Sequence, residues 1–398
     1  MLAAVALLAV APLPRPLAAA QARLPVPLRQ AMERIVWTPA RVDSLILALP
    51  QVETHLHLDG ALSPRTIREL AIQQNYKPLA QLSVSQIARK VVVQKKRDSL
   101  GEVLQAFRTI YPLLRTPQAV EEMAYQAVAA AKRQRVMYFE GRFAPALHTT
   151  PTFSQEQVLE AVLRGLERGR RDTGVRCGVI ICLLRGIPGV TREDNAQMAR
   201  LAIAYKDRGV VGLDLAGNEA AEPLSDFAEF FRQAKQAGLR TTAHVGEVPG
   251  SKDIETALEL GVDRLGHATL LAKEPALTRE VLRRGLPIEV NLTSNLRTNA
   301  VADLKQHPLR SWYEAGIPVT LSTDDPGIFG ITLQHEYRLL PRLRFSAQDI
   351  ATVAYEGIDA LFLPEADKQA LRERFEKGLA RTLKRIAKQP PFTDLGGR

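Results

Sequence analysis

The residues of this chain best suited to chemistry are a few histidines and carboxylates. His55 and His57 are separated by one residue in the string HLHLDG. On a β-strand, residues i and i+2 point to the same face, so both imidazoles would project together at a spacing able to hold one metal ion. Such a pair is a weak signal by itself, because most pairs with this spacing are surface or packing histidines.

A third histidine and an aspartate extend this pair into a possible metal site. His244 lies in TAHVGE and Asp324 in STDDP, each at the end of a short apolar run. Three imidazoles and one carboxylate form a plausible nitrogen and oxygen ligand set for zinc, with one position left for water.

A glutamate close to His244 could carry protons at such a site. Glu247 follows His244 by three residues in His-Val-Gly-Glu. Gly246 would let the chain turn sharply, so the carboxyl group could fold back over the metal and shuttle protons between water and substrate. The alternative interpretation is an acid near the N-terminus of a helix at 252–260.

A second aspartate stands directly beside the expected ligand. Adjacent strand residues diverge, so Asp324 could bind the metal while Asp325 faces the substrate. Alternatively, Asp325 simply caps the following turn, with Pro326 at its first position.

Short Val/Ile/Leu-rich runs alternate with longer stretches of helical spacing along most of the chain. The expected strands are 51–57, 136–143, 176–183, 210–215, 240–245, 263–267, 287–292 and 318–323. The expected helices between them are 118–134, 154–172, 193–208, 224–237, 252–260, 274–284 and 303–315. Eight such units favour the α/β class and a closed (β/α)8 TIM-type barrel over an open sheet. A mostly helical insertion (61–117) would follow the first strand, and extra C-terminal helices would occupy 345–388.

Polar and ionisable side chains follow the C-terminal ends of these expected strands. In a barrel all of those ends open on one face, which carries the active site. The group consists of His55, His57, Asp59, Asp214, Gly217, Glu219, His244, Glu247, His267, Asn291 to Asn295, Asp324 and Asp325. Their convergence by chance is improbable, because buried polar groups are costly unless paired. The histidines that end no strand, for which we expect solvated or packing side chains, are His148, His307 and His335.

Composition and charge exclude several classes of protein. The 398 residues are 46% apolar and 24% charged, an ordinary globular balance. The two cysteines, Cys177 and Cys182, lie on opposite faces of one expected strand, so they cannot bond to each other and are expected to be buried. The net charge of +10 suits anionic surfaces but does not imply nucleic-acid binding. No dinucleotide fingerprint or P-loop follows an expected strand.

The first twenty residues differ from the rest of the chain. Residues 2–11 form an apolar run that is too short to span a bilayer, and three alanines fit a cleavage site before Gln21. No basic residue precedes Arg15, and a disordered or packed apolar tail is the alternative. We predict a signal peptide over 1–20 and a single barrel domain over 21–398. The protein would then be periplasmic or secreted, and otherwise cytoplasmic.

Taken together, these strings resemble the adenosine deaminase family of metal-dependent amidohydrolase barrels. The matching strings are HLHLDG (55–60), YFEGRFAP (138–145), GLDLAGNE (212–219), TAHVGE (242–247), RLGHAT (264–269), TSN (293–295) and STDDP (322–326). They occur in the family's order and cover residues 50 to about 330. Each string is weak alone, whereas the ordered set is highly specific.

The resemblance implies a role for each residue that carries chemistry. One zinc ion per chain would be held by His55, His57, His244 and Asp324. Glu247 would give a proton to the purine N1 nitrogen, and His267 would orient or deprotonate the attacking water. Asp325 would hydrogen-bond that hydroxide or the purine N7 nitrogen.

The resemblance also implies a substrate pocket, with some departures from the family's strings. Gly217 would offer its backbone N–H to purine N3, and Asp59 would hydrogen-bond the ribose 5′-hydroxyl. Val245 and Ala268 replace the usual Ala and Gly, and the segment 291–293 stands where many members have Cys-Pro. None of these changes removes a ligand or a proton carrier, but they bear on the shape of the pocket and so on the preferred substrate.

The implied activity is hydrolytic deamination of adenosine or 2′-deoxyadenosine to inosine and ammonia. The implied partner is a small purine nucleoside, with no nucleic acid and no membrane span; the oligomeric state stays open. One alternative is a deaminase of another 6-substituted purine: adenine, N6-methyl-AMP or a modified nucleoside. Asp59 argues against the free base, because family members acting on adenine resemble HLHLEG. Another alternative is a secreted nucleoside-binding protein without turnover.

Overall fold

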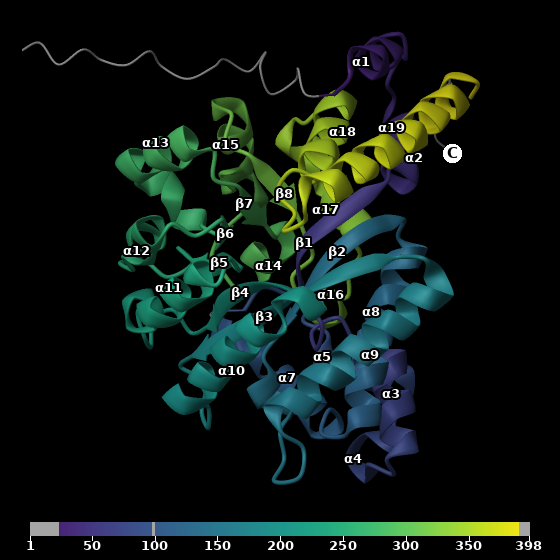
Figure 1. Cartoon of the computed structure of the whole chain (residues 1–398). Coiled ribbons are helices and arrows are strands. Elements are labelled where there is room, and N and C mark those ends of the chain that lie inside the picture. The colour runs from purple at the N-terminus through teal and green to yellow at the C-terminus, as the bar shows by residue number, and fades with distance from the viewer. Residues whose placement is uncertain (1–23, 98–99, 390–398) are drawn as a thin grey trace, which may run out of the picture.

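Eight parallel strands form a barrel in the computed structural model, which describes residues 24–97 and 100–389 (Figure 1). The strands are β1 (Gln51–His57), β2 (Val136–Phe143), β3 (Arg176–Arg185), β4 (Val210–Gly217), β5 (Arg240–Val245), β6 (Arg264–His267), β7 (Ile288–Val290) and β8 (Val319–Leu321). Each pairs with the next in sequence. The seam between β1 and β8 is completed beyond β8, where His57 N donates to Asp324 O at 2.8 Å and Asp324 N donates to His55 O at 3.0 Å. The predicted TIM-type barrel is confirmed.

Helices connect consecutive strands, as predicted. They are α8 (Pro117–Arg133), α9 (Gln155–Thr173), α10 (Arg192–Ala204), α11 (Ala228–Gln236), α12 (Asp253–Leu260), α13 (Pro275–Arg284), α14 (Leu292–Arg297) and α15 (Leu309–Ala315). Turns of 3-10 helix accompany them: η3 (Pro145–His148), η4 (Lys206–Arg208), η5 (Leu224–Phe227), η6 (Thr269–Lys273) and η7 (Leu304–Gln306). Capping boxes begin α9 at Ser154 and α10 at Thr191, and each satisfies backbone N–H groups that a helix start leaves unpaired.

Further helices flank the barrel. The insertion after β1 contains α3 (Pro64–Gln73), α4 (Lys77–Ala80), α5 (Val84–Val91), α6 (Leu100–Leu104), α7 (Phe107–Ile110) and η2 (Tyr111–Leu113), so it is helical as predicted. After β8 come α16 (Pro326–Phe329), α17 (Leu333–Leu339), η8 (Leu340–Leu343), α18 (Ala347–Glu356) and α19 (Glu365–Ala387). Figure 1 shows α19 (yellow) beside two helices that the sequence did not predict, α1 (Val26–Glu33) and α2 (Pro39–Ala48).

The last two strands are shorter than predicted, because polar residues turn the chain out of the sheet. The expected strand 287–292 ends at Val290, since Asn291 already begins α14. The expected strand 318–323 ends at Leu321, and the side chain of Ser322 accepts hydrogen bonds from the backbone N–H groups of Thr54 and His55 at 3.2 Å each. Because both strands end early, the polar residues that follow them are placed by a helix or a turn and not by strand alternation.

A network of buried charges fills part of the barrel. Arg142 donates to Asp214 at 2.9 Å and to Glu289 at 2.8 Å, and all three side chains are fully buried. Arg264 lies 2.6 Å from Glu289 and 2.6 Å from Glu140, also without solvent access. Taking charges out of water costs several kcal/mol per ion, so each arginine is needed to offset the carboxylates around it.

Two further predictions concern a signal peptide at the N-terminus and the absence of a membrane-spanning segment. The predicted signal peptide, residues 1–20, lies outside the described residues, so export and cleavage before Gln21 stay predictions. In the part of the chain that the structure describes, no helix is long and apolar enough to cross a membrane.

Replacing Arg264 with methionine is expected to destabilise the barrel strongly. The substitution keeps much of the side-chain volume but leaves Glu140 without a buried cation and Glu289 with Arg142 alone, at a cost of about 3–5 kcal/mol in the free energy of unfolding. Urea denaturation followed by circular dichroism measures this. Arg283→Met is the control, because Arg283 pairs with Glu280 on the surface and its loss should leave the midpoint close to that of the unmodified chain. Equal midpoints for both variants would contradict the role of the network.

Candidate active site

Four ionisable side chains meet at the C-terminal ends of the strands. Among the described residues, ligand atoms of His55, His244, His267 and Asp324 all lie within 4.8 Å of one another. His57 joins this group, because its Nε2 lies 3.2 Å from His244 Nε2 and 3.3 Å from Asp324 Oδ1. The barrel therefore brings together the four residues that the sequence suggested as metal ligands, with His267 beside them.

Buried carboxylates orient two of the histidines from below. His55 Nδ1 lies 2.7 Å from Glu289, and His244 Nδ1 lies 3.1 Å from Asp214. Burial alone would raise the pKa values of these carboxyls, but Arg142 and the two imidazoles hold the pKa of each well below its usual range. The carboxylates are therefore ionised and accept the Nδ1 proton, which leaves the Nε2 lone pair of each imidazole directed at the cluster.

The cluster fits a metal ion. His57 and His244 face each other through Nε2 atoms 3.2 Å apart, and His55 Nε2 is buried without a well-aligned hydrogen bond. Burial lowers the pKa of His244 to about 4, which keeps it neutral. Burial would raise the pKa of Asp324, but His55 and His57 hold it well below its usual range. A neutral imidazole at His244 and an ionised carboxylate at Asp324 are the protonation states that metal binding requires.

Two residues at this face adopt left-handed backbone conformations that are unusual outside glycine. Asp324 has φ 63°, and His267 has φ 57° and is followed by Ala268 at φ 49°. Such conformations are uncommon for residues with a Cβ and cluster at functional sites. Asp324 and Asp325 therefore diverge because the backbone turns at Asp324, and the prediction that strand alternation separates them was wrong.

Asp325 lies buried against the loop that follows β1. Its Oδ1 has no hydrogen-bond partner, and a Cβ atom on Gly60 would overlap this carboxyl group. The glycine of HLHLDG is therefore required for Asp325 to reach the site. Asp325 makes no capping hydrogen bond to α16, so the alternative of a simple turn cap is not supported. Burial, together with the charge of Asp324, raises the pKa of Asp325 well above its usual range.

Glu247 is positioned by a second glutamate that sequence reasoning did not assign a role. The carboxylate of Glu219 accepts hydrogen bonds from the backbone N–H groups of Gly246, Glu247 and Val248 at 2.8, 2.9 and 3.1 Å. This folds the loop so that Glu247 Oε1 lies 3.7 Å from His267 Nδ1. The helix that Glu247 was alternatively expected to cap begins at Asp253, with Lys252 at its N-cap.

The environment of Glu247 favours its protonated form. Burial raises the pKa of Glu247 to about 8, and the nearby charges of Glu219 and Asp324 act in the same direction. At neutral pH the carboxyl group is therefore largely a proton donor, which is the state that a general acid needs.

A chain of hydrogen bonds determines which nitrogen of His267 carries the proton. Leu309 N donates to His307 Nδ1 at 3.1 Å, so His307 Nε2 carries hydrogen and donates to Asn295 Oδ1 at 3.1 Å. Asn295 must then present its amide nitrogen to His267 Nδ1, 3.0 Å away. His267 Nδ1 is the acceptor, and Nε2 bears the N–H. Sequence reasoning treated His307 as a solvated or packing residue and could not see this chain.

Besides Asp325, the residues predicted to bind substrate are Asp59, which follows β1, and Gly217, which ends β4. Asp59 is only 3% exposed and hydrogen-bonded to Tyr111, and its Oδ2 lies 3.8 Å from His148 Nε2. His148 is fully buried, as the packing interpretation expected. Gly217 ends β4 with φ 109°, and a Cβ there would overlap the carbonyl oxygen of Arg185. Glycine is thus required at this position.

Comparison with known proteins identifies the family. The family model for adenosine deaminase matches residues 50–378. The chain belongs to the adenosine deaminase family. It is 34% identical over 333 residues to an adenosine deaminase of Lacticaseibacillus casei, covering 83% of this chain and 97% of the relative. The recognition from sequence strings is confirmed, and the chain is a deaminase-type hydrolase.

Solved structures show that related barrels act on different purines. An N6-mAMP deaminase from Arabidopsis is 30% identical with a TM-score of 0.72, covering 83% of this chain and 99% of that one. An adenine deaminase from Arthrobacter aurescens is 26% identical with a TM-score of 0.73, covering 84% and 99%. Family membership therefore leaves the choice of purine open.

Replacing Asp214 with asparagine is expected to weaken metal binding about 10–100-fold, the usual cost of removing a carboxylate behind a ligating histidine. Asparagine has the same shape but no negative charge to hold the Nδ1 proton of His244. Competition with a chromophoric chelator measures the affinity, and circular dichroism checks the fold. The control is Asp303→Asn, since Asp303 caps η7 away from the cluster. An affinity equal to that of the control would contradict this orienting role.

Proposed function

We propose that this chain is a zinc-dependent deaminase that converts adenosine and 2′-deoxyadenosine to inosine and ammonia. The observation that carries the proposal is the buried, protonated Glu247 next to a cluster of metal-type ligands. Amine loss from purine C6 needs both a strong nucleophile and a proton at N1, because attack at C6 otherwise breaks the aromatic ring without compensation. The site holds groups suited to both tasks.

The proposed zinc ligands are His55, His57, His244 and Asp324. The chemistry that zinc supplies when bound is a water molecule whose pKa falls toward about 7, so that it can act as a nucleophile at neutral pH. The neutral imidazole of His244 and the ionised carboxylate of Asp324 support this assignment, as does the nitrogen and oxygen donor set.

Glu247 would donate its proton to purine N1 as the water oxygen adds to C6. His267 would donate its Nε2–H to that oxygen, because the hydrogen bond from Asn295 occupies Nδ1 as an acceptor. This geometry supports the orienting role of His267 over the alternative of a base. Asp325, with its unpartnered Oδ1, would hydrogen-bond the same oxygen or purine N7. The proton that the attacking water releases would restore the Glu247 carboxyl group, and the C6 amino group would leave as ammonia with the proton of the C6 hydroxyl, so that C6 becomes a carbonyl.

The purine and its sugar would be recognised by residues at neighbouring strand ends. Gly217 would offer its backbone N–H to purine N3, and Asp59 would accept a hydrogen bond from the ribose 5′-hydroxyl. A 5′-phosphate close to the Asp59 carboxylate would be repelled, since two anions about 4 Å apart interact unfavourably by several kcal/mol in a partly dry site. A free base would leave Asp59 without its substrate partner. A nucleoside therefore suits this pocket better than AMP derivatives or adenine.

Ammonia release by zinc-loaded protein tests the proposed substrate. Adenosine and 2′-deoxyadenosine should exceed adenine, AMP and N6-methyl-AMP in kcat/KM by at least about tenfold, which corresponds to ~1.4 kcal/mol. Protein stripped of metal by slow dialysis should be inactive until zinc is returned. Asp59→Ala should reduce nucleoside use while changing adenine use little. If N6-methyl-AMP is the best substrate, the role proposed for Asp59 is wrong; activity in verified metal-free protein would refute the zinc dependence.

Glu247→Gln should retain the metal and the fold but lose turnover. Glutamine has the same shape and cannot donate the N1 proton, and loss of general-acid catalysis costs on the order of 10²–10⁴-fold in kcat. Steady-state kinetics and metal analysis of the variant measure this. Glu259→Gln, at an exposed position on α12, is the matched control and should behave like the unmodified chain. A Glu247 variant within about threefold of that control would rule out the proton-donor role.

A further inference from the structure

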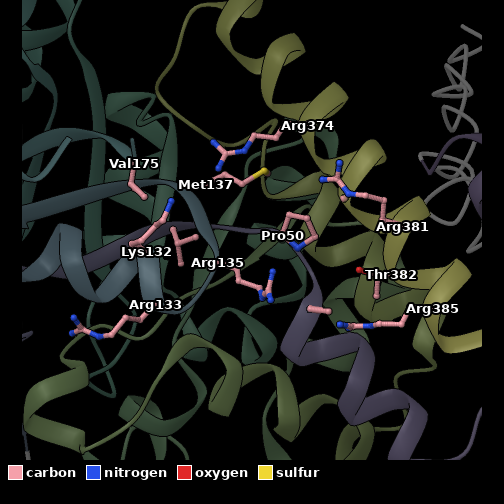
Figure 2. Close-up of a pocket in the computed structure, with 13 residues that line it drawn as sticks. Pro50, Lys132, Arg133, Arg135, Met137, Val175, Arg374, Arg381, Thr382 and Arg385 are labelled. Carbon is pink, nitrogen blue, oxygen red and sulfur yellow. The ribbon is translucent and has the colours of Figure 1, made fainter. Parts of the chain in front are cut away.

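A basic cleft lies at the end of the barrel opposite the candidate active site. Its volume is about 530 Å³, and it is lined by Pro50 just before β1, Val136 and Met137 at the start of β2, and Val175 just before β3. Six cationic side chains surround this apolar floor: Lys132, Arg133, Arg135, Arg374, Arg381 and Arg385 (Figure 2). None of the described lining residues is acidic.

The arginines of this cleft form no ion pairs with other described residues, in contrast to several other arginines on the surface. Arg168, Arg283 and Arg372, for example, each lie within 2.9 Å of a glutamate or aspartate. Among the described residues, no ion pair or side-chain hydrogen bond is formed by the five arginines of the cleft. Like charges gathered without counter-charges repel one another, so the arrangement is unfavourable unless an anion occupies it.

Helix charge preference explains only part of the cluster. Lys132 and Arg133 lie in the last turn of α8, where cations are stabilised by the helix dipole. Arg385 lies in the last turn of α19 and is favoured in the same way, whereas Arg374 and Arg381 precede that turn, so the dipole gives little reason for them. Arg135 has a left-handed φ of 61°, a conformation that costs energy for a residue with a Cβ.

The wall formed by α19 is closely packed against the barrel. Arg374, Arg381 and Arg385 are spaced by seven and four residues, which places them on one face of the helix. Gly378 lies between them, and a Cβ atom there would come within 2.5 Å of the Pro50 ring. The helix can approach β1 this closely only because residue 378 is glycine. The three guanidinium groups are therefore carried by a rigid element rather than by a loop.

We propose that this cleft binds a small ligand carrying two or more linked phosphates. Guanidinium groups hold phosphate oxygens in paired hydrogen bonds, and several of them together match a chain of phosphates. The volume is that of a small-molecule site, and the concave shape suits such a ligand better than a flat membrane. Val136 and Met137 are each only 2% exposed, so the cationic side chains rather than the apolar floor would make most of the contact with the ligand. The phosphate chain could come from a nucleoside triphosphate or from an inorganic polyphosphate.

Calorimetric titration of the full chain at physiological ionic strength tests the proposal. The probes are ATP, inorganic tripolyphosphate and adenosine, each added to zinc-loaded protein. The test variant is R374Q/R381Q, which removes two cations of the cleft. The matched control is K377Q/K384Q, which removes the same charge from exposed positions of α19 outside the cleft. Deaminase activity of both variants should stay unchanged, because the cleft is remote from the strand ends that carry the site.

Binding of tripolyphosphate that weakens at least tenfold in R374Q/R381Q and stays unchanged in K377Q/K384Q would support the proposal. Tighter binding of ATP than of tripolyphosphate would indicate that the ligand is a nucleotide. Equal binding of the two probes would indicate that it is an inorganic polyphosphate. Three results would overturn it: no binding of either phosphate probe, equal loss in both variants, or stronger retention of the protein by anionic lipid vesicles or duplex DNA at the same phosphate concentration. Adenosine binding that depends on Arg374 and Arg381 would also contradict it.

Discussion

The candidate site depends on one buried carboxylate, Glu289 on β7. It accepts the Nδ1 proton of His55, lies between the guanidinium groups of Arg142 and Arg264, and accepts a further hydrogen bond from Thr242 at 3.1 Å. An ionised carboxyl without solvent would be very costly alone, so the two arginines make its charge possible. That charge in turn sets the tautomer of His55. Stability of the barrel and orientation of a proposed metal ligand thus depend on the same group.

Above this network, the polar residues reach the site by leaving regular strand geometry. His267, the last residue of β6, and Asp324, three residues beyond β8, adopt left-handed conformations, and Glu219 holds the Gly246 loop in place by accepting three backbone hydrogen bonds. Each of these arrangements costs conformational energy or a buried charge. A rigid barrel whose buried charges are paired can offset that free energy, because the strands fix the points from which the loops start.

Much of the candidate site could be predicted because its residues lie at the C-terminal ends of strands. The bounds of β1, β2 and β5 follow from their apolar runs, and parallel strands bring their C-terminal residues to one face whatever the loops do. The roles of Glu289, Glu219 and His307 could not be predicted, since each acts on a partner far away in sequence: His55 and Glu289 are 234 residues apart. Such pairs leave no local periodicity, and only the closed barrel makes them neighbours.

The two ends of the barrel differ in the sign of the charges that remain available to a ligand. At the C-terminal ends, acidic residues such as Asp59 and Asp324 lie in or close to the cluster, while the nearby Arg142 is already held by Asp214 and Glu289. Under the proposed function, this end suits a neutral nucleoside better than a phosphate, because no free cation is offered there by these residues. At the N-terminal ends, guanidinium groups are unpaired and carboxylates are absent from the described lining. The net charge of +10 is therefore not distributed evenly over the two ends of the barrel. Paired arginines contribute little to ligand attraction, whereas the unpaired arginines gathered in the cleft would attract the proposed phosphate chain to a place remote from the candidate active site.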